Sequence, residues 1–270
     1  MSTRPAPTGQ IVRGANRKFA TTRAVSALIL REMATRYGRS PGGYAWAVLE
    51  PLAGIMVLGF GFSLLVRTPP LGSSFLLFFA TAFLPFMMYQ NISGAVGRCI
   101  HFSRALLFYP AVTWVDAALA RFILSLLTEV CITVILLTGL LLATDTRAVL
   151  DIATLVEAVA LAAFMGLGIG MLNCVLFGLF DVWTQVWSIV TRPMFLISGV
   201  FFVYEGLPQN VQGILWYNPL IHITGLMRQG FYSSYEASYV SIPYVVSVAG
   251  ICLFLGVMLM GRYHRVILNR

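Results

Sequence analysis

The stretch LARFILSLLTEVCITVILLTGLLLA, residues 119–143, decides the class of fold. It is apolar almost throughout, and its only charged residues are Arg121 and Glu129. A helix of roughly 20 mostly apolar residues crosses a bilayer hydrocarbon core about 30 Å thick. The stretch is long enough for that crossing, so it predicts a transmembrane helix.

Further stretches of the same character lie on both sides of it. They cover residues 46–66, 75–95, 152–177, 186–203 and 240–260. Each is long and apolar enough to be interpreted as a membrane span. Together with residues 119–143 they predict an all-α integral membrane protein with six transmembrane helices.

The composition agrees with this prediction. Of the 270 residues, 59% are hydrophobic and 10% are charged, and the mean hydropathy is +0.84. Soluble domains have about 45–50% apolar and about 25% charged residues, so soluble enzymes, disordered tails and secreted disulfide scaffolds are excluded. The four cysteines (Cys99, Cys131, Cys174 and Cys252) are widely spaced. We expect them to be small buried apolar side chains, without a metal site or a disulfide.

The positions of the basic residues predict the orientation. The net charge is +8, but eight basic residues precede Tyr44, and Arg262, Arg265 and Arg270 lie close to the C-terminus. Basic flanks are typical of cytoplasmic loops, so we expect both termini in the cytoplasm and no nucleic-acid partner. The basic N-terminal segment has no long apolar run followed by a cleavage site, so we expect it to be retained.

Residues 1–43 predict an N-terminal amphipathic interfacial helix. At 100° per residue, Ile29, Leu30, Met33, Ala34 and Tyr37 share one arc, and most of the arginines share the other. A helix of this kind lies in the plane of the membrane surface. Its simplest interpretation is a membrane anchor.

Residues 205–235 are fairly apolar but are interrupted by several glycines and prolines. A seventh crossing here would place the basic C-terminus outside the cell. We therefore expect a re-entrant periplasmic half-helix pair before the last span, at about 211–217 and 220–231. Such broken backbone is tolerated at membrane depth only where protein or a water-filled cavity covers it.

The link 97–110 between the second and third spans mixes arginines with large apolar residues, among them Leu106, Leu107 and Phe108. Apolar patches with a polar rim commonly mark protein interfaces. One interpretation is a short helix that docks on a cytoplasmic partner. The other is a second interfacial helix covered by lipid, and the residues alone leave both open.

Charged residues inside the spans are few, and each costs roughly 2.5–3.5 kcal/mol at the centre of a membrane. We therefore expect Arg121, Glu129 and Arg192 to face water or to pair with other helices. Because Lys18 is the only lysine, no GxxxxGK[ST] phosphate loop exists, and HExxH and GxSxG are also absent. We expect no catalytic residue, metal or cofactor on this chain.

Two groups of motifs resemble a known family. Residues 30–51 contain LRE at 30–32, TRYGRS at 35–40, GYxW at 43–46 and LEP at 49–51, and NPL at 218–220 precedes RxGFY at 228–232. These motifs are similar to those of type 2 ABC exporter permeases, the transmembrane subunits of the capsular polysaccharide and O-antigen export family. The resemblance extends from about residue 27 to residue 265.

The resemblance implies a homodimer in the bacterial inner membrane that works with two copies of a separate cytoplasmic ABC ATPase, which binds ATP and Mg²⁺. It implies a lipid-linked capsular polysaccharide as substrate, with O-antigen, teichoic acid or another lipid-linked molecule as alternatives. Periplasmic and outer-membrane export proteins are further partners it allows. It also implies a cytoplasmic segment 1–43 with a gate helix, and a six-span domain 44–270 with a coupling loop at 97–110.

The resemblance also assigns roles to particular residues. Those of the gate helix are Arg31, Glu32, Arg36, Tyr37 and Arg39. Those that couple to the ATPase are Arg98, His101, Phe102, Ser103, Arg104, Leu106 and Leu107. Those of the periplasmic re-entrant cap, within 205–235, are Trp216, Tyr217, Asn218, Pro219 and Arg228. Because such exporters line their channel partly with aromatic rings, the candidates for the substrate channel are Phe60, Tyr89, Trp187, Arg192 and Tyr204.

Two other classes of protein remain as alternatives. An ion-coupled secondary carrier is expected to have inverted repeats and paired intramembrane acids, and the sequence displays no repeat between its halves. A membrane-embedded glycan-processing enzyme would need a cluster of acids or histidines, which the sequence lacks.

Overall fold

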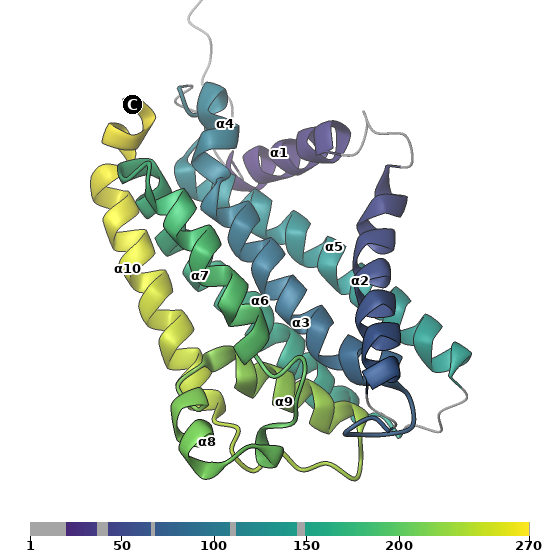
Figure 1. Cartoon of the computed structure of the whole chain (residues 1–270). Coiled ribbons are helices and arrows are strands. Elements are labelled where there is room, and N and C mark those ends of the chain that lie inside the picture. The colour runs from purple at the N-terminus through teal and green to yellow at the C-terminus, as the bar shows by residue number, and fades with distance from the viewer. Residues whose placement is uncertain (1–19, 37–42, 66–67, 109–111, 145–148, 270) are drawn as a thin grey trace, which may run out of the picture.

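The computed structural model describes residues 20–36, 43–65, 68–108, 112–144 and 149–269 (Figure 1). These ranges form ten α-helices and one 3-10 helix, and no strand occurs in them. The α-helices are α1 (Ala20–Arg36), α2 (Tyr44–Leu65), α3 (Phe75–Gly97), α4 (Cys99–Leu107), α5 (Trp114–Ala143), α6 (Ile152–Leu179), α7 (Trp183–Ile197), α8 (Gln209–Leu215), α9 (Pro219–Phe231) and α10 (Ile242–Asn269). The 3-10 helix is η1 (Tyr204–Gly206).

Five helical segments of the described chain are long and apolar enough to cross a membrane. They are α2, the continuous pair α3 and α4, α5, α6 and α10. This confirms the all-helical class and five of the expected spans. The sixth, expected over 186–203, is helical only as α7, which ends at Ile197 after 15 residues, or about 22 Å of helix. The count of six therefore stays a prediction.

The backbone after α7 explains why the helix ends there. Gly199 has a φ of +77°, in the left-handed region that glycine adopts without steric cost. The Thr224 hydroxyl of α9 donates to the Ser198 carbonyl over 2.8 Å. A carbonyl that would otherwise continue a helix is thereby satisfied by a neighbouring element.

Side-chain caps fix the starts of the helices α5 and α6. At α5, Thr113 and Asp116 form a reciprocal capping box. At α6, the Asp151 carboxylate accepts hydrogen bonds from the backbone N–H groups of Ala153 and Thr154. The Thr154 hydroxyl also donates to Asp151, and this hydrogen bond lowers the pKa of the exposed carboxyl group.

The helix α6 lies at the centre of the bundle and packs against α3, α9 and α10. Glycines allow the close approach. A Cβ added at Gly166 or Gly170 would meet Ile92 or Val96 of α3 at 2.8–2.9 Å, and one added at Gly168 would overlap the Ala249 carbonyl oxygen of α10. Small residues at such positions let the backbones of membrane helices come close together.

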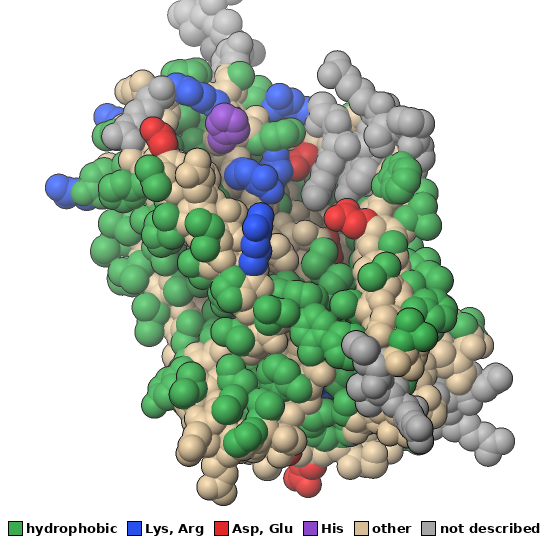
Figure 2. All heavy atoms as spheres, viewed as in Figure 1, with side chains coloured by type: hydrophobic (Ala, Val, Ile, Leu, Met, Phe, Trp, Pro, Cys, Tyr) green, Lys and Arg blue, Asp and Glu red, His purple; other side chains and the backbone are tan. Residues whose placement is uncertain are grey.

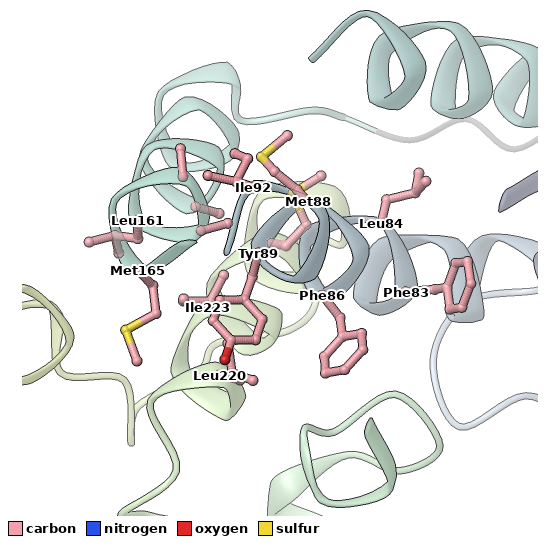
Figure 3. Close-up of a cluster of buried hydrophobic side chains, with 14 of the residues drawn as sticks. Phe83, Leu84, Phe86, Met88, Tyr89, Ile92, Leu161, Met165, Leu220 and Ile223 are labelled. Carbon is pink, nitrogen blue, oxygen red and sulfur yellow. The ribbon is translucent and has the colours of Figure 1, made fainter. Parts of the chain in front are cut away.

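The helix α3 provides most of the buried side chains of the core. Figure 3 shows Tyr89 beside Leu220 and Ile223 of α9, with Phe86 pointing away from them. Tyr89 is 1% exposed and Phe86 is 2% exposed. The same helix therefore packs against α6 and α9 on one side and supports a second group of aromatic side chains on the other.

The two ends of the bundle carry different elements. The helices α1 and α4 lie at the same end as the C-terminal end of α10, and α8 and α9 lie at the opposite end (Figure 1). The helix α7 runs along the bundle between these ends. Helices occur where the half-helices of 205–235 were expected, at Gln209–Leu215 and Pro219–Phe231.

The helix α1 packs against α5. Its buried residues are Leu28 and Glu32, whereas Leu30 and Met33, on the expected apolar arc, are 68% and 41% exposed. The contact with the bundle therefore uses a different side of the helix from the arc expected to enter lipid. Its interfacial position stays a prediction.

The close contact between α6 and α10 predicts the effect of a single methyl group. Gly168→Ala should lower the free energy of unfolding by about 1–3 kcal/mol, because the new Cβ forces the two backbones apart. Gly250→Ala on α10 is the matched control, since a Cβ there meets nothing within 4 Å. Thermal unfolding of the purified protein in detergent measures both, and equal melting temperatures would contradict the packing.

Candidate functional site

A groove of about 1470 Å³ opens on one side of the chain. Its walls come from α3, α4, α6 and α7, and Glu32 of α1 and Arg121 of α5 close its upper edge. Figure 2 shows this face hollowed, with basic side chains near the end that carries α4 and hydrophobic side chains below them. A groove of this volume is the first candidate for a binding path.

The chemistry of the lining changes along the groove. Arg98, His101 and Arg104 lie at the end formed by α4, which is the basic mouth of the groove. Along α7 the lining continues through the hydroxyl groups of Thr184, Ser188 and Thr191 to Arg192, with Gln90 and Asn91 on the α3 wall.

Aromatic side chains close the inner part of the groove. The ring of Phe195 on α7 lies 6.0 Å from that of Phe83 and 5.1 Å from that of Phe86, both on α3. Phe195 also meets Phe201 at 5.2 Å in an edge-to-face arrangement. Such contacts add about 0.5–1.5 kcal/mol per pair beyond area burial, so they hold α7 against α3 at this level.

The helix α7 otherwise has few attachments. None of its residues is buried in the single chain. Near its start, the Trp183 indole N–H donates to the Asn173 side-chain oxygen of α6 over 3.0 Å. The helix is thus tied at its two ends, by Trp183 and by Phe195, and its middle forms a wall of the groove.

A second interaction links three helices at the upper edge. The Arg121 Nε atom lies 2.9 Å from Glu32 Oε2, and the Arg121 guanidinium lies 3.8 Å from the centre of the Phe102 ring. This confirms the expectation that Arg121 pairs with another helix. Glu129 accepts a hydrogen bond from the Asn91 side chain of α3 over 2.8 Å, which again places an intramembrane charge against a neighbouring helix.

Within the described residues, no group of three or more His, Cys, Asp or Glu side chains is placed to hold a metal ion. The Cys99 and Cys174 Sγ atoms lie 3.5 Å apart as buried thiols.

The lining of the groove offers cations, hydroxyls, amides and aromatic faces, which suit an anionic or sugar-containing molecule.

A profile of the ABC-2 type transporter family matches residues 23–232. The chain belongs to the ABC-2 type transporter family. The matched region runs from within α1 to just after α9, and includes α4, α8, α9 and every groove-lining residue except Ile267 of α10.

Three relatives are similar to the chain over most of its length. The polysialic acid transport protein KpsM of Escherichia coli is 30% identical over 237 residues, which cover 87% of the chain and 91% of KpsM. The capsule polysaccharide export inner-membrane protein CtrC of Neisseria meningitidis is 28% identical over 245 residues, which cover 90% of the chain and 92% of CtrC. The capsule polysaccharide export inner-membrane protein BexB of Haemophilus influenzae is 26% identical over 243 residues, which cover 90% of the chain and 92% of BexB.

The five channel candidates of this ABC-2 transporter chain lie in different surroundings. Trp187 and Arg192 line the groove. Phe60 is 58% exposed on the outer side of α2, and Tyr89 is buried in the core. Tyr204 lies near the opposite end, where its ring stacks on that of Tyr239 at 4.0 Å. The structure brings together two of the five.

The expected coupling residues lie on one short helix. Arg98, His101, Phe102 and Arg104 line the mouth of the groove, and Phe102 is 48% exposed. Ser103 is buried, and Leu106 and Leu107 are half-buried, so the exposed apolar surface of α4 comes instead from Phe102 and Phe108. Residues 109 and 110 of the expected loop lie outside the described residues.

The expected gate residues are only partly described. Arg31 is exposed on α1, and Glu32 is buried against α5. Arg36 is the last residue of α1, and its side chain is outside the described atoms. Tyr37 and Arg39 also lie outside the described residues.

The expected cap residues fix the start of α9 and connect the segment before it to α7 and to Tyr239. Asn218 caps α9 through a hydrogen bond from the Leu220 N–H, and its side-chain amide donates to the Ile197 carbonyl over 3.0 Å. Pro219 occupies the first turn of α9, where no N–H is needed. The Trp216 indole donates to the Tyr239 carbonyl, whereas Tyr217 is 70% exposed.

Arg228 is the most deeply buried of these cap residues, at 2% exposure. Its guanidinium donates to the carbonyls of Phe202 over 2.7 Å and Val200 over 3.3 Å, and lies 4.2 Å from the centre of the Phe78 ring. These contacts hold the irregular segment after α7 against α9 and α3.

The sequence interpretation missed the aromatic side chains that close the inner part of the groove (the aromatic closure) and the row of hydroxyl groups along α7 (the hydroxyl wall). Thr184, Ser188 and Thr191 line the groove together with Phe195. Their spacing of four, three and four residues places them on one side of a helix. That periodicity was available in the sequence, and it would have identified the side of α7 that faces the groove.

The buried position of Arg228 predicts a loss of stability on truncation. Arg228→Leu should lower the free energy of unfolding by about 2–3 kcal/mol, because the buried carbonyls of Phe202 and Val200 lose charged donors. Arg262→Leu, an exposed arginine on α10, is the control and should change little. Thermal unfolding tests this, and a similar melting temperature for both variants would contradict it.

Proposed function

We propose that the chain is the permease subunit of an ATP-driven exporter that moves a lipid-linked capsular polysaccharide out across the bacterial inner membrane. The observation that carries the proposal is the groove along α3 and α7, with a basic mouth, a hydroxyl wall and an aromatic closure. The three relatives named as capsule or polysialic acid transport proteins support this choice of substrate over O-antigen or teichoic acid.

The lining suits such a substrate physically. A hydrated glycan needs polar partners along its whole path, because lipid hydrocarbon offers none. Arginines at the mouth attract the phosphate of a lipid carrier or the acid groups of a charged glycan. Aromatic faces can stack against the C–H faces of sugar rings further along.

The chain crosses the membrane six times in this proposal, with both termini in the cytoplasm. The course of α7 along the bundle supports α7 and the irregular residues after it as the fifth crossing (Figure 1). Residues 1–43 then form the cytoplasmic segment with α1 at the membrane surface, and 44–270 form the transmembrane domain. The helices α8 and α9, within 205–235, form the cap on the periplasmic side.

A second copy of the chain completes the path. The helix α7 has no buried residue, and α2 exposes a row of apolar side chains that includes Trp46, Val57, Phe60 and Leu64. An open polar groove facing lipid would leave its hydroxyls and amides without partners. A homodimer that joins these two helices across the groove encloses it and gives Phe60 a place at the shared surface.

The power for export comes from two copies of a separate ABC ATPase that binds ATP and Mg²⁺. The sequence contains no phosphate loop, so this chain needs such a partner. The helix α4, within 97–110, is its docking element, because Phe102 is exposed there between Arg98 and Arg104 and Phe108 is exposed directly after it, at the predicted cytoplasmic end. Periplasmic and outer-membrane proteins then receive the glycan.

Deletion and complementation test the proposal in the bacterium that carries this gene. A strain without the gene should accumulate capsular polysaccharide in the cytoplasm and lose it from the surface, and the gene on a plasmid should restore it. Normal surface capsule in the deleted strain would reject the proposed function. Separate immunoblots should record the membrane level of the chain.

A charge reversal tests the groove itself. Arg192→Glu should lower surface export of an anionic capsule by about tenfold, because a charged cleft concentrates an oppositely charged ligand by this order. Arg262→Glu reverses a charge on α10 outside the groove lining and should leave export near the wild-type level. Antibody or lectin staining of intact cells measures both, and equal export would contradict the proposed path.

A further inference from the structure

Arg121 lies where three helices with different proposed roles meet. It belongs to α5, its guanidinium is paired with Glu32 of α1, and the same group covers the Phe102 ring of α4. Both α1 and α4 pack against α5. The side chain therefore touches, at once, the helix proposed as gate and the helix proposed as docking element.

The two contacts differ in how easily they can change. Glu32 and Arg121 are 6% and 8% exposed. Separating them would leave a nearly buried carboxylate away from its cation, which is strongly unfavourable. Phe102 is 48% exposed and contributes a cation–π contact, which is weaker than a buried ion pair. The weaker contact therefore involves the more exposed side chain.

The difference in strength between the two contacts of Arg121 favours transmission of movement from α4 to α1. A partner that moves α4 acts first on the Phe102 ring, because that ring is both exposed and seated on the guanidinium. The guanidinium then shifts or reorients, and Glu32 follows it because the ion pair is the stronger contact. A displacement at α4 is thereby delivered to α1.

We propose that Arg121 is a positioning residue that transmits movement from α4 to α1. It receives the movement through its contact with Phe102 and passes it on through its ion pair with Glu32. The inference rests on the proposed function, in which α4 receives the ATPase and α1 gates the groove. It goes beyond that function by naming the side chains that connect the two. All three residues line the upper edge of the groove, so the movement also changes the width of its mouth.

The test uses the complete complex of the chain with its ATPase, reconstituted in proteoliposomes with lipid-linked capsular polysaccharide. Phe102→Leu removes the ring but keeps an apolar side chain on α4. The glycan exported per ATP hydrolysed should fall by about tenfold, an ordinary size for energetic coupling between two sites. Weaker docking alone would lower ATP hydrolysis and export together and leave this ratio unchanged. Phe102→Tyr keeps the aromatic face and should retain wild-type coupling.

Hydrogen–deuterium exchange supplies a readout that a merely structural contact would not change. In the wild-type complex, ATP binding should alter the exchange of α1. In Phe102→Leu this nucleotide-dependent change should disappear from α1 and persist in α4. In Phe102→Tyr it should be present in both helices.

A charge exchange tests the output side. Arg121→Glu alone should abolish coupling and lower the amount of folded protein, because it places an acid beside Glu32. Combining it with Glu32→Arg restores an ion pair between α1 and α5 and should recover folded protein. The pair should nevertheless remain uncoupled, because a carboxylate now lies under the Phe102 ring.

Defined outcomes would overturn the inference. Unchanged coupling and unchanged α1 exchange in Phe102→Leu would reject the transmission role. A proportional loss of hydrolysis and export would reject it as well, because Phe102 would then act only in docking. If the wild-type complex itself exports no glycan, the proposed function fails, and this result is separate from any difference between the variants.

Discussion

Lipid hydrocarbon provides no hydrogen-bond partner, so a charged side chain in a long helix needs a partner from the protein or from water. Arg121 pairs with Glu32, Glu129 is bonded to Asn91, and Arg228 donates to two backbone carbonyls. The hydroxyls of Thr184, Ser188 and Thr191 and the cations of Arg98, Arg104 and Arg192 line one groove. A hydrated path beside an apolar outer surface follows from this separation.

The same constraint explains the unusual position of α7. Its polar side faces the groove, and no residue of the helix is buried within the single chain. It is attached through Trp183 at one end and through the aromatic group around Phe195 at the other. These attachments are few beside the contacts of the core formed by α3, α6 and α10, which glycines hold in close contact.

The helical class and most of the span positions could be predicted from the sequence, because a long apolar run has one structural meaning in a protein of this composition. The end of α7 at Ile197 could not, because it depends on the left-handed Gly199 and on a hydrogen bond from Thr224, far along the chain. Among the channel candidates, Trp187 and Arg192 line the groove, while Tyr89 packs into the core. Aromatic residues suit both surroundings equally, so composition cannot separate them, whereas the helical spacing of Thr184, Ser188 and Thr191 could have identified the lining side.

In the proposed function the chain provides a path for the glycan, and another subunit supplies the energy. Reconstitution in proteoliposomes tests this most directly, by comparing the isolated chain with the chain plus its ATPase in the presence of lipid-linked capsular polysaccharide. If the chain is such a permease, the isolated chain should neither hydrolyse ATP nor move glycan, and ATP-dependent glycan movement should appear once the ATPase is added. Nucleotide turnover by the purified chain alone, or glycan movement driven by an ion gradient without ATP, would contradict it.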